Sequence, residues 1–213
     1  MKSMRRAASL RTLPSALLAL ALLSACGGSA PPSLPFHSTE VSGIDYGRGL
    51  KLADSEGVAR SLEDFRGRVL IVFFGFASCP DVCPTTLARL HMVRQAMGAD
   101  AAQLQVAFVT VDPERDTGER LGAYVRSFDP SFVALRPEPS QLEAVIQAFH
   151  AVAVKVPVGD GGADSIARGE YTIDHSATFY VYDRANHLRL IAQPDIDVTK
   201  FAADLQRLAH EPA

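Results

Sequence analysis

Residues 69–74 form an unbroken apolar run, Val-Leu-Ile-Val-Phe-Phe, rich in β-branched and aromatic side chains. A strand of this composition has no polar face, so we expect it to be buried on both sides in the centre of a sheet. Residues 106–111 predict a second strand. Between the two strands, residues 85–97 carry Leu87, Leu90 and Met97 at helical spacing. The order strand, helix, strand predicts a parallel pair covered by a helix.

The rest of the chain continues to alternate between strands and helices. A hairpin is predicted at residues 50–59 with its turn at 55–57, and Asp116 and Glu119 stand at capping-box spacing at the start of a helix. Further helices are predicted at 116–128, 139–150 and 198–209, and further strands at 152–156, 177–182 and 188–192. We therefore expect the fold class α/β, with a mixed central sheet flanked by helices and an N-terminal β-hairpin. This pattern is compatible with a thioredoxin-like fold.

The first residues have the composition of an export signal. A basic segment precedes the apolar run 13–23, which is too short to span a bilayer as a mature helix. The following Leu-Ser-Ala-Cys resembles the lipobox of bacterial lipoproteins, which implies that Cys26 carries a lipid anchor. An ordinary leader cleaved nearby and an uncleaved anchor are the alternatives. We expect a signal peptide at 1–25, a lipid-anchored flexible linker at 26–40 and a globular domain at 41–213, exported to the periplasmic face of a membrane.

The charge distribution disfavours nucleic acid as a partner. The chain has 21 basic and 24 acidic side chains, and four of the basic ones lie in the leader. The remaining 17 basic and 24 acidic side chains give the body a net charge of −7. A body of this sign repels phosphate backbones, and no run of Lys or Arg follows the leader.

Two cysteines define the most informative stretch of the chain. Cys79 and Cys83 follow the first apolar strand directly and precede a helix. Pro84 suits the first helical position, which places Cys83 near the N-cap. Backbone N–H groups at a helix N-terminus favour thiolate, so we expect lowered pKa values for both thiols. The spacing suits a redox pair or two ligands of a metal, whereas buried cysteines that serve only as small hydrophobes are the structural alternative.

Two sulfurs and one imidazole would suit copper, because Cu(I) prefers soft ligands. Among the six histidines, His91 is about 12 Å along the helix from Cys83, too far to share an ion. His150 ends a helix, where capping is its expected role, and the remaining candidates other than His175 are expected to be solvated. His175 lies in a predicted loop that enters a strand. Spacing alone leaves open whether it is a ligand or an ordinary polar residue.

Three motifs together resemble the Sco/SenC family. These are residues 74–88 (FGFASCPDVCPTTLA), residues 110–117 (TVDPERDT) and residues 174–176 (DHS). The resemblance implies a thioredoxin-like fold that binds one copper ion per chain, as Cu(I) or Cu(II), through Cys79, Cys83 and His175. The chain departs from the family pattern at Gly118 and at residues 136–137, which puts only local loop geometry in doubt.

Two acids are candidates for supporting the ligands. Asp112 follows a strand that should end beside the cysteine loop, and Asp174 immediately precedes the candidate histidine. Either could orient a ligand or present charge to a partner. Turn and helix-cap chemistry is the alternative for Asp112, and an ordinary loop acid is the alternative for Asp174.

The resemblance implies a copper metallochaperone for the binuclear copper site of cytochrome c oxidase. Its expected partners are subunit II of the oxidase, an upstream copper donor or thiol reductant, and a membrane through the lipid anchor. The main alternative is a thiol-disulfide oxidoreductase that reduces the cysteines of that site with Cys79 and Cys83. A peroxiredoxin-like peroxidase and a purely structural lipoprotein account less well for the cysteine pair and its surroundings.

Overall fold

The computed structural model describes residues 35–49 and 51–212, and a compact unit begins at Phe36. The strands are β1 (Thr39–Glu40), β2 (Leu52–Asp54), β3 (Ala59–Arg60), β4 (Val69–Gly75), β5 (Leu104–Thr110), β6 (Val133–Arg136), β7 (Ala153–Pro157), β8 (Tyr171–His175), β9 (Phe179–Tyr182) and β10 (Leu188–Ala192). The α-helices are α1 (Val82–Ala96), α2 (Gly118–Arg126), α3 (Leu142–Ala148), α4 (Gly162–Ala167) and α5 (Val198–His210). Short 3-10 helices are η2 (Leu62–Phe65), η3 (Gly98–Gln103) and η4 (Pro139–Gln141).

The predicted leader and its candidate anchor Cys26 lie outside the described residues, so both remain predictions. Within the part of the chain that the structure describes, no helix has the length and apolar character needed to cross a membrane.

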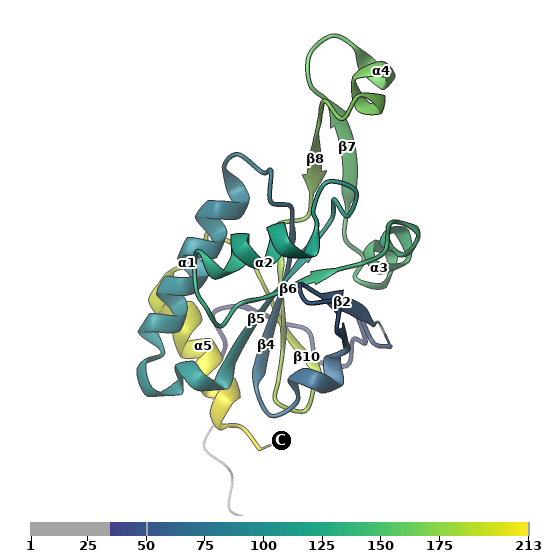
Figure 1. The fold of residues 1–213 in the computed structure, drawn as a ribbon. Helices are drawn as coiled ribbons and strands as arrows, with labels where there is room; N and C mark the ends of the chain where they lie inside the picture. Colours follow the sequence, from purple (N-terminus) through teal and green to yellow (C-terminus); the bar gives the residue numbers. More distant parts are fainter. Residues whose placement is uncertain (1–34, 50, 213) are drawn as a thin grey trace, which may run out of the picture. The chain divides into compact units, whose positions relative to one another are not determined.

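Eight strands form one mixed sheet in the order β1-β10-β9-β4-β5-β6-β2-β3 (Figure 1). The apolar run 69–74 lies at its centre as β4. It pairs in parallel with β5 from Val69↔Leu104 to Gly75↔Thr110, and antiparallel with β9 on its other side. The predicted parallel pair with its intervening helix is therefore confirmed.

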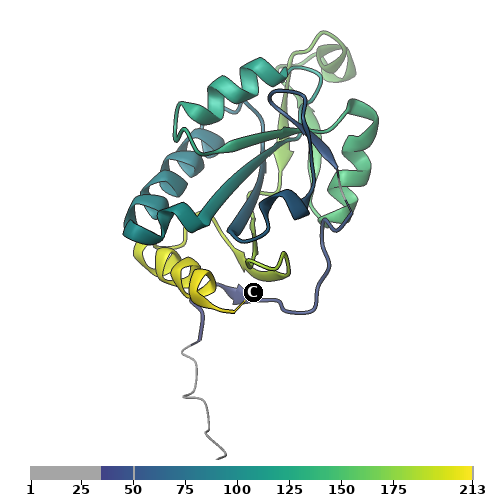
Figure 2. The same ribbon diagram turned by 60° about the horizontal axis from the view of Figure 1, so that its bottom comes forward.

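The two faces of β4 enter two different cores, which explains why the strand has no polar side. Val69, Ile71 and Phe73 pack in a core that includes side chains of α1, α2 and α5. The alternate residues Leu70 and Val72 pack in a second core that includes Val145 of α3. Figure 2 shows α1 and α5 side by side on one face of the sheet and α3 on the opposite side. This is the thioredoxin-like arrangement expected from the sequence.

The N-terminal part of the unit confirms the predicted hairpin and shifts the domain boundary. Strands β2 and β3 pair with Leu52↔Arg60, and β2 also joins the edge of the sheet through β6. The expected linker, however, contributes to the fold at its C-terminal end: Thr39 pairs with Ile191, and Phe36 packs against the first core. The compact unit thus begins at Phe36, whereas the sequence suggested residue 41.

Helix α1 begins earlier than expected. The N-cap is Asp81, so Cys83 lies within the first turn and Pro84 occupies the third helical position. The prediction of Cys83 near the N-cap and Pro84 at the first position was wrong by about two residues. Because the first four N–H groups of a helix have no intrahelical acceptor, Pro84 costs no hydrogen bond at its observed position.

The predicted start of the next helix was also wrong. Helix α2 begins at Gly118, and the Thr117 side chain caps it by accepting a hydrogen bond from the Arg120 N–H. Asp116 is instead fully buried, and its Oδ2 accepts hydrogen bonds from Thr110 Oγ1 at 2.6 Å and Ala77 N at 3.0 Å. A side chain held by the interior in this way is not available to cap a helix.

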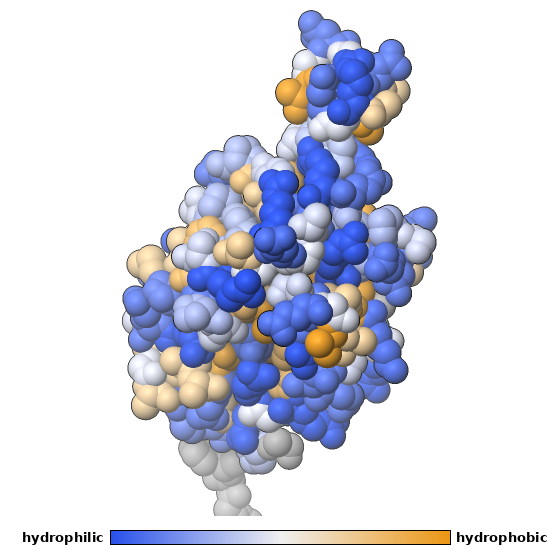
Figure 3. All heavy atoms as spheres, in the orientation of Figure 1, coloured by the Kyte–Doolittle hydropathy of each residue, from blue (hydrophilic) through white to orange (hydrophobic). Residues whose placement is uncertain are grey.

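The segment between β7 and β8 differs most from the prediction. β7 pairs with β8 in a separate two-stranded sheet, and α4 lies between them in a segment outside the predicted helices. β8 itself occupies the segment predicted to be a loop around His175. We call residues 153–175 the hairpin arm. Figures 1 and 3 show it standing out from the rest of the unit, with α4 at its outer end.

Candidate metal centre

The two cysteines lie on the connection from the central strand to helix α1. Cys79 is half-buried in the loop after β4, whereas Cys83 is fully buried in the first turn of α1. The Cys83 N–H donates a hydrogen bond to the Cys79 sulfur over 3.4 Å. This N–H is one of those a helix leaves without an intrahelical acceptor, so the helix start holds the two sulfur-bearing residues together.

The buried side chain of Asp116 holds the start of the cysteine loop. Its hydrogen bond from the Ala77 N–H ties the loop to the end of β5, where Thr110 donates to the same oxygen. On the surface side, Arg120 donates to Ser78 Oγ over 2.7 Å. Burial raises the pKa of Asp116, against the opposing effect of these hydrogen bonds. The loop is thus anchored on both sides immediately before Cys79.

His175 reaches the cysteines from a different part of the chain. It is the last residue of β8, and its Nε2 lies 3.5 Å from the Cys83 sulfur. Its Nδ1 lies 3.0 Å from the carbonyl oxygen of Ser176, which can only accept a hydrogen bond. Nδ1 therefore carries the proton, and Nε2 presents a lone pair toward the sulfurs.

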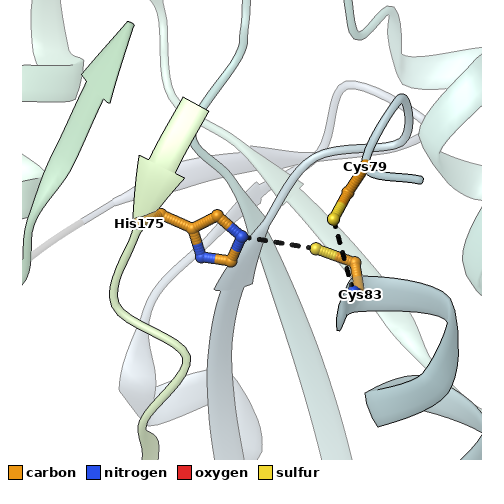
Figure 4. Close-up of side chains that lie close together, drawn as sticks. All are labelled: Cys79, Cys83 and His175. Atoms are coloured by element: carbon orange, nitrogen blue, oxygen red, sulfur yellow. Dashed lines mark hydrogen bonds between the residues drawn. The ribbon is translucent and has the colours of Figure 1, made fainter. Parts of the chain in front are cut away.

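The three side chains converge on a volume suited to one ion. The sulfur atoms of Cys79 and Cys83 and a ring nitrogen of His175 all lie within 4.8 Å of one another. Figure 4 shows the Cys83 sulfur between the imidazole ring and the Cys79 side chain. Two thiolates and one imidazole form a soft, three-coordinate donor set, which fits Cu(I). Among the described residues this group has no fourth protein ligand of the kind that completes a structural zinc site.

Burial sets the protonation states of the buried ligands. It raises the pKa of the Cys83 thiol well above its ordinary range and lowers the pKa of His175, against smaller opposing effects of Ser176 and Asp174. The expectation that the helix N-terminus lowers the pKa of both thiols was wrong for Cys83, because loss of solvent outweighs the helix dipole there. At neutral pH the site holds a neutral imidazole, and an incoming metal ion must displace the Cys83 proton.

Apolar rings border the imidazole on its protein side, and an open groove borders the site on its outer side. The rings of Phe73 and Phe76 meet the His175 ring edge-on, with centroids 6.4 Å and 5.9 Å away. A groove of roughly 300 Å³ runs between the cysteine loop and β8. Its lining includes Phe76, Cys79, Pro80, Val82, Ile173 and His175. A partner's ligand can therefore approach Cys79 and His175 from this groove while Cys83 stays covered.

The two candidate acids occupy different environments. Asp174 is exposed beside His175, while the His175 Nδ1 bonds to the Ser176 carbonyl. Asp112 is 1% exposed and accepts a hydrogen bond from Tyr171 OH, and its other side-chain partner is Arg115. Asp112 therefore lies close to the arm that carries His175 but bonds to neither thiol nor imidazole.

The other histidines lie outside the centre. His91 Nδ1 pairs with Asp129 at 2.9 Å, and His150 has a left-handed backbone (φ 50°) with its ring against Tyr46. The remaining three lie beside acidic side chains, namely His37 beside Asp204, His187 beside Asp183 and His210 beside Asp100. His175 is the histidine that the described structure brings to the cysteines.

Sequence reasoning missed Phe76 and Ser176, which contact the imidazole, and Tyr171, which begins the strand that carries it. Tyr171 was detectable in principle, because Tyr171, Ile173 and His175 alternate along one face of a strand. The signal was lost because the segment was predicted to be a loop. Phe76 and the Ser176 carbonyl carry no pattern that distinguishes them from other loop residues.

Comparison with known proteins decides the family. The profile of the SCO1/SenC family matches residues 39–210, nearly the whole compact unit. This chain belongs to the SCO1/SenC family. It is 31% identical over 141 residues to a SCO2-like protein of Rickettsia prowazekii, an alignment that covers 66% of each chain. It is 37% identical over 132 residues to the human mitochondrial SCO2 homolog, covering 61% of this chain and 47% of the human protein.

A solved SCO1/SenC structure has the same fold. The copper-bound structure of ScoI from Bradyrhizobium japonicum is 36% identical and superposes with a TM-score of 0.67. The match covers 76% of this chain and 99% of that one. The curated relatives are matched over less than two thirds of their length, so the similarity extends to the folded SCO1/SenC unit and not to the whole of those proteins.

Proposed function

We propose that this SCO1/SenC chain is a copper metallochaperone, in which Cys79, Cys83 and His175 bind one copper ion as cargo. The observation that carries the proposal is the convergence of two sulfurs and one imidazole nitrogen within 4.8 Å, from segments more than 90 positions apart. If the two cysteines and the histidine served only to pack the interior, their soft donor atoms would not need to meet at one point. The Bradyrhizobium relative with copper bound supports the choice of metal.

The proposed recipient is subunit II of cytochrome c oxidase, with its binuclear copper site. The groove beside Cys79 and His175 leaves the outer side of the ion open, so a recipient thiol can add to copper before a donor of this chain leaves. Such stepwise exchange keeps copper coordinated throughout the transfer. An upstream copper donor is expected to load the site by the reverse exchange.

The proposed location is the periplasmic face of a membrane, with Cys26 as the lipid anchor. The proposal is supported by the basic segment, the short apolar run and the lipobox-like residues before Cys26. Anchoring would confine the head to the layer near the membrane, where an integral oxidase subunit exposes its copper site. Metabolic labelling with a fatty acid, compared between the native chain and Cys26→Ser, tests this proposal.

The central experiment is copper titration of the reduced full-length chain in a mild detergent, against a competing Cu(I) chelator. We expect one tightly bound Cu(I) per chain, and binding at least about a hundredfold weaker in Cys79→Ser and Cys83→Ser, because each removes a thiolate ligand. His175→Ala is expected to weaken binding less. His187→Ala removes an exposed imidazole and serves as the matched control. Equal binding by the native chain and Cys79→Ser would refute the copper-site assignment.

A second function is favoured by the unequal exposure of the two thiols. Cys79 borders the groove whereas Cys83 is buried behind it, an arrangement suited to attack by one thiol and resolution by the other. The Cys79 thiolate would attack a disulfide of the target, and Cys83 would displace the target thiol. The target gains two thiols while this pair becomes a disulfide. His175→Ala should preserve this reductase activity, whereas chaperone activity should require His175; oxidase copper content in cells carrying each variant separates the two.

A further inference from the structure

The position of His175 depends on an element that is not part of the main sheet. Among the described strands, β8 pairs with β7 alone, through five register pairs from Ala153↔His175 to Pro157↔Tyr171. The cysteines, in contrast, follow the central strand β4 directly. The distance between imidazole and thiols is therefore set by whatever holds the hairpin arm against the body of the domain.

A buried hydrogen bond joins the arm to the main sheet. Tyr171 begins β8 and lies on the same face of the strand as His175, four residues later. Its hydroxyl donates to Asp112 Oδ1 over 2.8 Å. Asp112 lies just beyond β5, and its N–H is fixed by Thr110 Oγ1 at 3.0 Å. Because Asp112 is 1% exposed, water cannot easily replace the tyrosine as its donor.

Arg115 also joins the hairpin arm to the main sheet, because it contacts both Asp112 and Tyr171. Its Nε pairs with Asp112 Oδ2, and its guanidinium carbon lies 3.7 Å from the centroid of the Tyr171 ring. Its Nη1 donates to the Tyr171 carbonyl oxygen over 2.9 Å. One arginine thus bonds to the body of the domain, to the aromatic ring and to the backbone of β8. A planar guanidinium suits this combination of stacking and hydrogen bonding, which a lysine cannot reproduce.

The same cluster reaches the metal centre through Phe76. The Arg115 guanidinium lies 5.9 Å from the Phe76 ring centroid, and the Phe76 ring meets the His175 ring edge-on at 5.9 Å. Phe76 precedes Cys79 by three residues on the cysteine loop. Arg115 therefore holds the strand that ends in His175 and also contacts the Phe76 ring. Phe76 belongs to the cysteine loop and packs against the His175 ring.

We infer that Tyr171, Asp112 and Arg115 are positioning residues that form a clamp holding the His175 imidazole beside the two thiols. The clamp touches neither sulfur nor the imidazole nitrogen and acts only by placing β8. This inference rests on the proposed copper site, because its functional consequence passes through His175. It assigns Asp112 the role of anchoring the strand that carries His175, and gives Tyr171 a role through its hydroxyl group.

The test compares Tyr171→Phe with Tyr182→Phe in the full-length chain. Each variant removes one hydroxyl that makes a hydrogen bond from a buried ring, since Tyr182 OH donates to the Tyr46 carbonyl oxygen over 2.7 Å. Tyr182 lies in β9 of the main sheet, and within the described residues its hydroxyl bonds to Tyr46 and not to the arm. The pair therefore separates a general loss of a buried hydrogen bond from a loss of the clamp.

The first readout needs no copper. In the reduced, copper-free chain, nuclear Overhauser contacts between the His175 ring protons and the β-protons of Cys83 report the position of the imidazole. We expect these contacts to weaken in Tyr171→Phe and to persist in Tyr182→Phe. Arg115→Gln, which alters a partly exposed side chain, should reproduce the effect if Tyr171→Phe folds poorly. Contacts of native strength in both Tyr171→Phe and Arg115→Gln would overturn the inference.

The second readout is copper binding, measured as Cu(I) affinity and as the Cu(II) spectra. We expect the Cu(I) affinity of Tyr171→Phe to fall about tenfold, as for loss of one hydrogen bond to a charged group, and its Cu(II) absorption and EPR signals to move toward those of His175→Ala. Tyr182→Phe should retain the native signals. Native affinity and spectra in Tyr171→Phe would also overturn the inference. If the native chain binds no copper while the Overhauser contacts respond as expected, the proposed function fails and the clamp stands.

Discussion

A Cβ atom added to Gly75 would lie 2.7 Å from the sulfur of Cys83 and 2.6 Å from the Phe108 ring. Gly75 is the last residue of the central strand, and Cys83 lies in the first turn of the following helix. The buried ligand therefore packs directly on the backbone of β4. Only a residue without a side chain permits this contact, because a real Cβ requires a larger separation.

Gly75→Ala is therefore expected to displace Cys83 and weaken Cu(I) binding by at least about tenfold, with a stability loss of about 1–3 kcal/mol from overpacking. The measurements are chelator competition and urea unfolding. Ala107→Val overpacks β5 in the opposite core and is the control. It should lower stability by a similar amount and leave copper affinity unchanged. Native copper affinity in Gly75→Ala would show that Cys83 tolerates the displacement.

Copper affinity is expected to rise with pH. Burial raises the pKa of Cys83, so the thiol is protonated across the neutral range and copper must displace its proton. Each displaced proton makes the apparent affinity increase about tenfold per pH unit, up to the pKa of the group. The measurement is Cu(I) competition from pH 6 to pH 8, corrected for the chelator. Cys83→Ser should give a shallower slope, and a slope as steep as that of the native chain would contradict the prediction.

Asp204 is expected to hold the N-terminal segment onto helix α5. Its carboxylate is 3% exposed and accepts hydrogen bonds from the N–H of His37, the N–H of Ser38 and the hydroxyl of Ser38 at 2.7–2.9 Å. Asp204→Ala should lower the free energy of unfolding by about 2–4 kcal/mol, because it leaves the two buried Ser38 donors and the part-buried His37 N–H without this acceptor. Amide hydrogen exchange at residues 37–40 should accelerate at the same time. Unchanged exchange there would show that β1 is held by its sheet pairing alone.

Asp129 is expected to stabilise the fold at neutral pH and to lose this stabilising contribution in acid. Burial favours the protonated form, but hydrogen bonds from Ser131 and His91 and the charge of Arg94 outweigh it and hold the pKa below its ordinary value of about 3.9. A lowered pKa in the folded state stabilises the fold above the unfolded pKa, and the contribution is lost as pH falls through the folded pKa.

The free energy of unfolding of Asp129→Ala should thus fall below that of the native chain by about 1–3 kcal/mol at pH 7. The difference should shrink between pH 4 and pH 3. Urea unfolding at several pH values measures it, with the exposed Asp160→Ala as the control variant. A difference that stays constant down to pH 3 would show that the effect comes from packing and not from the ionised carboxylate.

The sequence determined the central part of the fold because burial on both faces leaves a distinct pattern. The apolar run of β4, the second run of β5 and the helical spacing of α1 fixed a parallel pair with a helix between them. The cysteine pair was equally visible, since its position between a strand and a helix follows from the local order of residues. The predicted helix starts were less accurate, because Asp116 has the residue type of a cap yet bonds to Thr110 and Ala77 instead.

Apart from the family resemblance, which pointed to His175, only the tertiary structure decided which histidine meets the thiols and what holds it there. His175 is 92 positions from Cys83, and no local pattern encodes a contact at that separation. Of the two strands of the arm, β7 was predicted at 152–156, whereas β8 escaped prediction. Among the described strands the two pair only with each other, and a short, half-exposed strand lacks the continuous apolar signal of a central strand. Local periodicity records which residues share a face of one element, whereas the meeting of imidazole and sulfur depends on how separate elements pack in three dimensions.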